Sequence, residues 1–187
     1  MLIGKTRVKK ALLIQVCAAA FLVGLCAASV SAATIHNLQV NGTGTVSISS
    51  GACPSFSCAT GPCFCFQYSG TIKGTGISSA MIALTEQEDT GTRGNTCAEA
   101  FGFGTLTEKN GDTVDLDLGI EQCDSFNATS SAFFADTSGT FNITGGTGKL
   151  ANAAGGGGVN LTTGDVSSCG SGCTATATFF LDGGFTK

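Results

Sequence analysis

Alternation of apolar and polar residues, broken at short intervals by turn-forming residues, is the feature that most constrains the fold of this chain. About eight extended segments carry the alternation, and Gly, Asn, Asp and Ser are concentrated between them. The segments lie near Thr34–Ser49, Phe64–Gly74, Ile77–Glu88, Cys97–Glu108, Thr113–Cys123, Ser131–Thr144, Gly157–Thr163 and Cys173–Phe185. Only the alanine-rich residues 150–154 favour a helical turn. The sequence therefore predicts an all-β fold.

The connections between the segments limit how the strands can be arranged. Most are short enough to join antiparallel neighbours, so the strands are expected to pair in sequence order. Eight such strands predict an antiparallel up-and-down barrel, which leaves no sheet edge exposed. A two-sheet β-sandwich is the alternative.

The N-terminus has the three parts of a secretory signal peptide. Four basic residues lie in the first ten positions, an apolar stretch runs from Ala11 to about Leu25, and Val30 and Ala32 supply small residues before a cleavage site. We expect residues 1–32 to be removed and residues 33–187 to form a single domain that is secreted or otherwise extracytoplasmic, in the periplasm or at the cell surface. An uncleaved membrane anchor is the alternative, but Gln15 interrupts a stretch near the lower length limit for a membrane span.

Charge excludes one class of partner. Removing residues 1–32 takes away four of the nine basic residues and none of the 13 acidic ones, so the mature domain has a net charge of −8. The five remaining basic residues are scattered singly, which provides no basic surface for nucleic acid. No later segment is long and apolar enough to cross a membrane as a helix, so no membrane contact is expected after cleavage.

Eight cysteines remain after the expected cleavage, an even number typical of a disulfide framework in an exported protein. They are Cys53, Cys58, Cys63, Cys65, Cys97, Cys123, Cys169 and Cys173. Four of them lie within residues 53–65, but their spacings are C-x4-C, C-x4-C and C-x-C and not the paired C-x2-C of zinc modules. We therefore expect four disulfides, no metal and no cofactor.

Hairpin geometry favours two of the pairs. The Asn110-Gly111 dipeptide lies between two alternating segments, a strong hairpin signal. A three-residue loop centred on Asn110 places Cys97 opposite Cys123. A second tight turn would join Cys169 to Cys173, and the other four cysteines would then pair among themselves within residues 53–65.

The same hairpin register sorts the residues of two strands between the barrel's two faces. Small residues Ala98, Ala100, Gly102 and Gly104 share one face with Leu106 and lie opposite Val114, Leu116, Leu118 and Ile120, a combination suited to a narrow barrel interior. The other face carries Glu99 opposite Glu121, with Asp115 and Asp117 nearby. Glu99 and Glu121 are the candidate catalytic residues, because a buried carboxyl pair can supply an acid and a base. We assign this face to the outside, where the acids would belong to a solvated surface.

The segment Phe141–Gly158, FNITGGTGKLANAAGGGG, resembles a glycine-rich segment of the allene oxide cyclase and dirigent barrel superfamily. The order of an NGDT turn (Asn110–Thr113), the GGTGK segment (Gly145–Lys149) and a closing strand is also similar to small exported bacterial proteins that look related to these barrels. The resemblance implies an eight-stranded, calycin-like barrel. It also implies that a ligand could bind inside, because in the plant members reactive ligands bind inside the barrel, where acidic or other polar groups guide cyclisation or coupling.

Candidate catalytic groups are otherwise few. The one histidine, His36, is expected to be exposed at the start of the first strand, and no G-x-S-x-G motif accompanies it. The sequence therefore favours an exported non-catalytic structural or interaction domain. The alternatives are a carrier of a small apolar ligand and a dirigent-like or cyclase-like enzyme. A packed interior would support the first hypothesis and an open apolar cavity the others; the sequence predicts neither the oligomeric state nor the partner.

Overall fold

Eight β-strands and one short helical turn make up the described part of the chain. The computed structural model describes residues 33–54, 57, 63–77, 79–89, 97–127, 129, 131–167 and 172–187, so the expected signal peptide at residues 1–32 lies outside the described residues. The elements are β1 (His36–Ser50), β2 (Cys63–Thr75), β3 (Ala80–Asp89), β4 (Cys97–Glu108), β5 (Thr113–Asn127), β6 (Ala132–Gly146), η2 (Gly148–Leu150), β7 (Ala154–Thr163) and β8 (Cys173–Thr186). In this part of the chain, no helix is long and apolar enough to span a bilayer.

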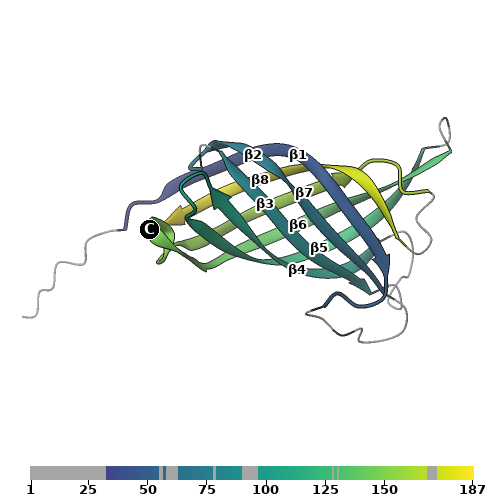
Figure 1. Cartoon of the computed structure of the whole chain (residues 1–187), viewed down its shortest axis with the longest axis horizontal. Helices are drawn as coiled ribbons and strands as arrows, with labels where there is room; N and C mark the ends of the chain where they lie inside the picture. The colour runs from purple at the N-terminus through teal and green to yellow at the C-terminus, as the bar shows by residue number, and fades with distance from the viewer. Residues whose placement is uncertain are drawn as a thin grey trace, which may run out of the picture. The chain divides into compact units, whose positions relative to one another are not determined.

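The strands form a closed antiparallel barrel in sequence order (Figure 1). Each strand pairs with the next, and β1 closes the barrel by pairing with β8 from His36 opposite Phe185 to Ile48 opposite Cys173. The up-and-down barrel predicted from the strand pattern is therefore confirmed, and the β-sandwich alternative is excluded. Closure gives every strand two hydrogen-bonded neighbours, so no long sheet edge is left for another chain to pair with.

The largest difference from the predicted strands lies in the glycine-rich segment. The sequence predicts a loop over residues 145–156, whereas β7 begins at Ala154 and includes all four consecutive glycines. A Cβ atom at Gly157 would collide with the Asp182 carbonyl oxygen of β8. Gly155 and Gly157 have no room for side chains because β7 lies so close to β8 there, whereas a Cβ atom at Gly158 would meet no atom nearer than 3.9 Å. The helical turn expected at residues 150–154 forms slightly earlier, as η2.

The two segments that carry the family resemblance contact each other. The Thr113 N–H donates to the Thr147 hydroxyl oxygen at 3.0 Å, and the Thr147 N–H donates to the Thr113 carbonyl oxygen at the same distance. The Asp112 carboxylate accepts a hydrogen bond from the Lys149 N–H at 3.2 Å. The NGDT turn and the GGTGK segment therefore form one structural junction at the end of the barrel, next to η2.

The barrel interior is apolar along most of its length. Buried side chains from all eight strands form one continuous cluster, and Leu150 and Ala153 pack against it next to η2. The predicted inward faces of β4 and β5 are confirmed, with small residues opposite large aliphatic ones. The buried polar residues Glu86, Gln122, Thr137 and Thr163 lie toward the other end, where β3, β5 and β7 end and β6 begins.

Disulfides link neighbouring strands and the segment before β2. Cys97 is bonded to Cys123, as the hairpin register predicts, and Cys53 is bonded to Cys65 within the cysteine-rich segment. Cys63 and Cys173 are also disulfide-bonded. The predicted partner of Cys173, Cys169, lies outside the described residues, as does Cys58. These disulfides are consistent with a location outside the cytoplasm.

Candidate functional site

The most unusual group in the barrel interior is the carboxyl group of Glu86. Glu86 is fully buried on β3, where it lies opposite Phe66 of β2 and Gly102 of β4. Charged side chains are rarely buried completely without a partner. Neither Glu86 oxygen makes a hydrogen bond of ordinary geometry within the described part of the chain. A buried carboxyl in this state marks a candidate functional site.

The alternation of β3 explains why this side chain points inward. Ala80, Ile82 and Leu84 face the core, and Glu86 is the next residue in the same phase. Room for its side chain comes from the neighbouring strand, because a Cβ atom at Gly102 would lie only 3.1 Å from the Cγ of Glu86. The missing side chain at Gly102 therefore leaves room for the Glu86 side chain in the narrow barrel interior.

Three polar residues from other strands accompany Glu86. Tyr68 on β2 and Thr137 on β6 are near enough to favour the ionised carboxylate. The Thr137 hydroxyl also donates to Gln122 Oε1 of β5 at 3.5 Å, which is a long hydrogen bond. The Tyr68 ring in turn packs edge-on against Phe179, with the ring centroids 6.2 Å apart. The acid therefore lies in a small polar group bounded by aromatic side chains.

Burial dominates the electrostatics of this group. Desolvation raises the pKa of Glu86 from 4.5 to about 8, and Tyr68 and Thr137 only partly oppose the increase. The carboxyl group is therefore mostly protonated at neutral pH. A protonated carboxyl can donate a hydrogen bond to a polar atom of a ligand, or a proton to a reacting group.

Hydrogen bonds hold Cys53 and Ser57 of the cysteine-rich segment against β3. The Cys53 N–H donates to Gln87 Oε1 at 3.0 Å, and Gln87 Nε2 donates to the Ser57 carbonyl oxygen at 3.2 Å. The disulfide from Cys53 to Cys65 joins the same segment to β2. Because Gln87 follows Glu86 on β3, these bonds hold Cys53 and Ser57 against the face of the strand opposite to the one that carries the interior acid.

Glu99 and Glu121, the residues proposed from the sequence, lie on the outside of the barrel. They are directly opposite each other on β4 and β5, and both are exposed. Together with Phe101, Gly119, Ile120, Ser138 and Gly139 they line a groove of about 580 Å³ across β4, β5 and β6. We call this feature the outer groove. The expected outward orientation of these acids is confirmed, and it separates them from the interior polar group.

One group of potential metal ligands adjoins the outer groove. Ligand atoms of Cys97, Glu121 and Cys123 lie within 4.8 Å of one another. The two sulfur atoms are joined in a disulfide, however, and a metal-binding cysteine needs a thiolate. In the disulfide-bonded form, the Glu121 carboxylate is therefore the one ligand that this group offers to a metal ion.

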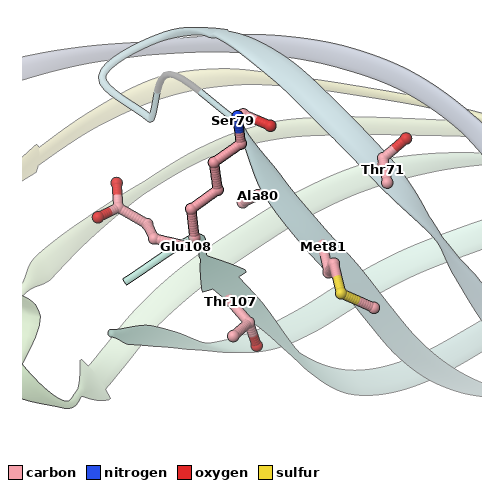
Figure 2. Close-up of a pocket in the computed structure, with 7 residues that line it drawn as sticks. Thr71, Ser79, Ala80, Met81, Thr107 and Glu108 are labelled. Atoms are coloured by element: carbon pink, nitrogen blue, oxygen red, sulfur yellow. The ribbon is translucent and has the colours of Figure 1, made fainter. Parts of the chain in front are cut away.

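A second pocket lies on the outer surface near the turn between β4 and β5. It has a volume of about 310 Å³, and Figure 2 shows Thr71, Met81 and Thr107 around it, with Glu108 at the end of β4. Met81 is 66 % exposed. Its charged lining residues, Glu108 and Lys109, have opposite signs, so the pocket offers no net charge to a partner.

His36 lies at the start of β1, as predicted, but it is half-buried and not fully exposed. Its ring centroid is 5.5 Å from that of Phe185, its partner residue on β8. Barrel closure, which places β8 beside β1, explains the additional burial.

Sequence reasoning did not single out Glu86. The run Glu86-Gln87-Glu88 is polar throughout, and the burial of Glu86 depends on neighbouring strands that local patterns do not place around it. One signal was present, because Glu86 continues the apolar phase of Ala80, Ile82 and Leu84. An acidic residue at a position where the alternation predicts an inward-facing apolar side chain can be recognised from the sequence.

Comparison with family models, curated proteins and solved structures finds no match to this chain. The resemblance to the allene oxide cyclase and dirigent superfamily therefore stays a prediction from the GGTGK and NGDT segments.

Proposed function

We propose that the chain functions outside the cytoplasm as a non-catalytic interaction domain, a disulfide-linked barrel that binds a partner on its outer surface. The observation that carries this proposal is the outer groove, where Phe101 is 58 % exposed. An exposed aromatic beside a hollow is a typical feature of protein-binding surfaces. The continuous cluster of buried apolar side chains inside the barrel also supports a role for the outer surface.

Site-specific photo-cross-linking tests the proposal. A photoreactive phenylalanine analogue is placed at position 101, and in a control variant at position 180, where Phe180 is 38 % exposed on β8. Both variants are incubated with extracytoplasmic extract from the source organism. We expect one discrete cross-linked partner from position 101 and none from position 180. Equal cross-linking at the two positions, or none at either, would contradict the proposal.

A second candidate function follows from Glu86. A largely apolar interior with one protonated acid suits a small apolar molecule that carries a hydrogen-bond acceptor. The superfamily resemblance supports the same site, as a carrier or as a cyclase-like enzyme with Glu86 as the proton donor. Native mass spectrometry of the unreduced protein, after exposure to extract from its source, tests this alternative. A bound molecule that is lost in Glu86→Gln would favour it, whereas an empty protein would leave the interaction domain preferred.

A further inference from the structure

The outer groove has the chemistry to bind a positively charged side chain. We infer that it binds an arginine or lysine side chain carried by a basic segment of a partner protein. This inference rests on the proposed function, and it specifies the partner's chemistry. Three observations carry it: a pair of carboxylates with no ion-pair partner among the described residues, an exposed aromatic ring and an open space at Gly119 in the same groove.

The carboxylates of Glu99 and Glu121 both line the outer groove, and no residue in the described part of the chain compensates their charge. They are directly opposite each other on adjacent strands, an arrangement in which like charges destabilise a sheet. Neither has an ion-pair partner among the residues that the structure describes. A cation placed between the two carboxylates would remove this repulsion and could form charge-assisted hydrogen bonds with both.

Phe101 supplies the apolar contact that a bare acidic cluster lacks. It follows Glu99 by two residues on the outer face of β4, and both side chains line the same groove. A guanidinium or ammonium group over a phenylalanine ring gains cation–π attraction, and the alkyl stem of the same side chain can cover apolar surface. The combination of ring and carboxylates therefore favours arginine or lysine over a simple ion.

The groove is open because the residue opposite Phe101 is Gly119. A Cβ atom at Gly119 would meet only the Thr140 hydroxyl oxygen, at 3.9 Å. The space above Gly119 is therefore open; Gly119 lies opposite Phe101, and Glu99 and Glu121 form the next outward pair along the same two strands. A larger residue at this position would fill the groove without disturbing the strands beneath it.

A disulfide constrains the two strands beside the groove, and the expected charge of the domain attracts cations. The next outward pair along the β4–β5 ladder is Cys97 and Cys123, whose disulfide fixes the register of the two glutamates. A binding site fixed in advance loses less conformational entropy when its partner binds. The expected net charge of −8 on residues 33–187 would also accelerate association with a basic partner.

A purely structural role for Phe101 is the main alternative. An aromatic residue often packs across a sheet against an opposing glycine and stabilises the pair. Such a role predicts that Phe101→Leu lowers the melting temperature and has no separate effect on binding. The proposed role predicts weaker binding at unchanged stability, because leucine retains the apolar bulk and loses the ring.

Titration calorimetry with hexa-arginine, hexa-lysine and hexa-glutamine peptides tests the inference on the disulfide-bonded protein. We expect the two basic peptides to bind and the neutral peptide not to bind. Glu99→Gln combined with Glu121→Gln should weaken binding about tenfold. Gly119→Leu should weaken it about as much by filling the groove, and Phe101→Leu about threefold.

The matched control removes the same charge from the same outer face. Asp115→Asn combined with Asp117→Asn changes β5 residues that do not line the groove. The affinity of this variant for the basic peptides should therefore stay within about twofold of the wild-type affinity at the same ionic strength. Equal weakening by the two double variants would show non-specific attraction and overturn the inference, as would the absence of peptide binding. If position 101 still captures a partner by cross-linking while the basic peptides fail, only the basic occupant is wrong. If cross-linking fails as well, the proposed function also fails.

Discussion

At the scale of single residues, the interior acid makes stability depend on pH. Burial raises the pKa of Glu86 to about 8, so between pH 4.5 and 8 the unfolded chain releases a proton that the folded chain retains. The contribution of Glu86 to stability is therefore fully present below about pH 4.5 and is lost as the pH rises toward 8. We expect the wild-type free energy of unfolding to fall by on the order of 3 to 5 kcal/mol across this window from this group alone.

The substitution Glu86→Gln isolates that effect, because glutamine is neutral at every pH in the window. We expect the variant to be more stable than the wild type at pH 8 and to show a much flatter pH dependence. Urea denaturation at pH 5, 6.5 and 8 measures the difference. A variant that keeps the wild-type slope would show that Glu86 is not the buried titrating group.

At the scale of the elements, the β4–β5 hairpin depends on one disulfide as well as on its turn. The bond between Cys97 and Cys123 closes a loop with a sequence separation of 26 residues, and closing such a loop restricts the unfolded chain. Replacing both cysteines with alanine should lower the free energy of unfolding by about 3 kcal/mol. Denaturant unfolding without reductant measures the loss. An unchanged midpoint would mean that strand pairing alone sets the stability of the hairpin.

The same hairpin shows how far prediction from sequence reaches. The Asn110-Gly111 turn fixed the register, and the register correctly placed Cys97 opposite Cys123 and separated the inward from the outward faces. Local turn geometry was sufficient because the paired residues are close in sequence. The glycine-rich start of β7 and the burial of Glu86 depend instead on strands and segments that are distant in sequence. Neither the β7–β8 approach nor the polar group around Glu86 could therefore be derived from local patterns.

At the scale of the whole molecule, closure of the barrel makes the two ends of the domain neighbours. His36 pairs with Phe185, so the start of β1 and the end of β8 are adjacent (Figure 1). A circular permutant can therefore join Lys187 to Thr34 by a short Gly/Ser linker and begin at Gly111, in the exposed turn between β4 and β5. The disulfide between Cys97 and Cys123 would keep the new ends together.

We expect this permutant to fold into the same barrel, with a melting temperature lowered by only a few degrees, because no strand pairing is lost. Circular dichroism would measure the melting temperature, and amide hydrogen exchange would measure the protection of each strand. We expect β1 and β8 to be protected as in the parent protein. A second permutant opened between Gly102 and Phe103, in the middle of β4, is the control and should fail to fold, since it interrupts the pairing with both β3 and β5. The contrary outcome is a first permutant in which β1 and β8 lose their hydrogen-exchange protection while the remaining strands stay ordered. That outcome would show that β1 pairs with β8 only when the chain has its original order of strands.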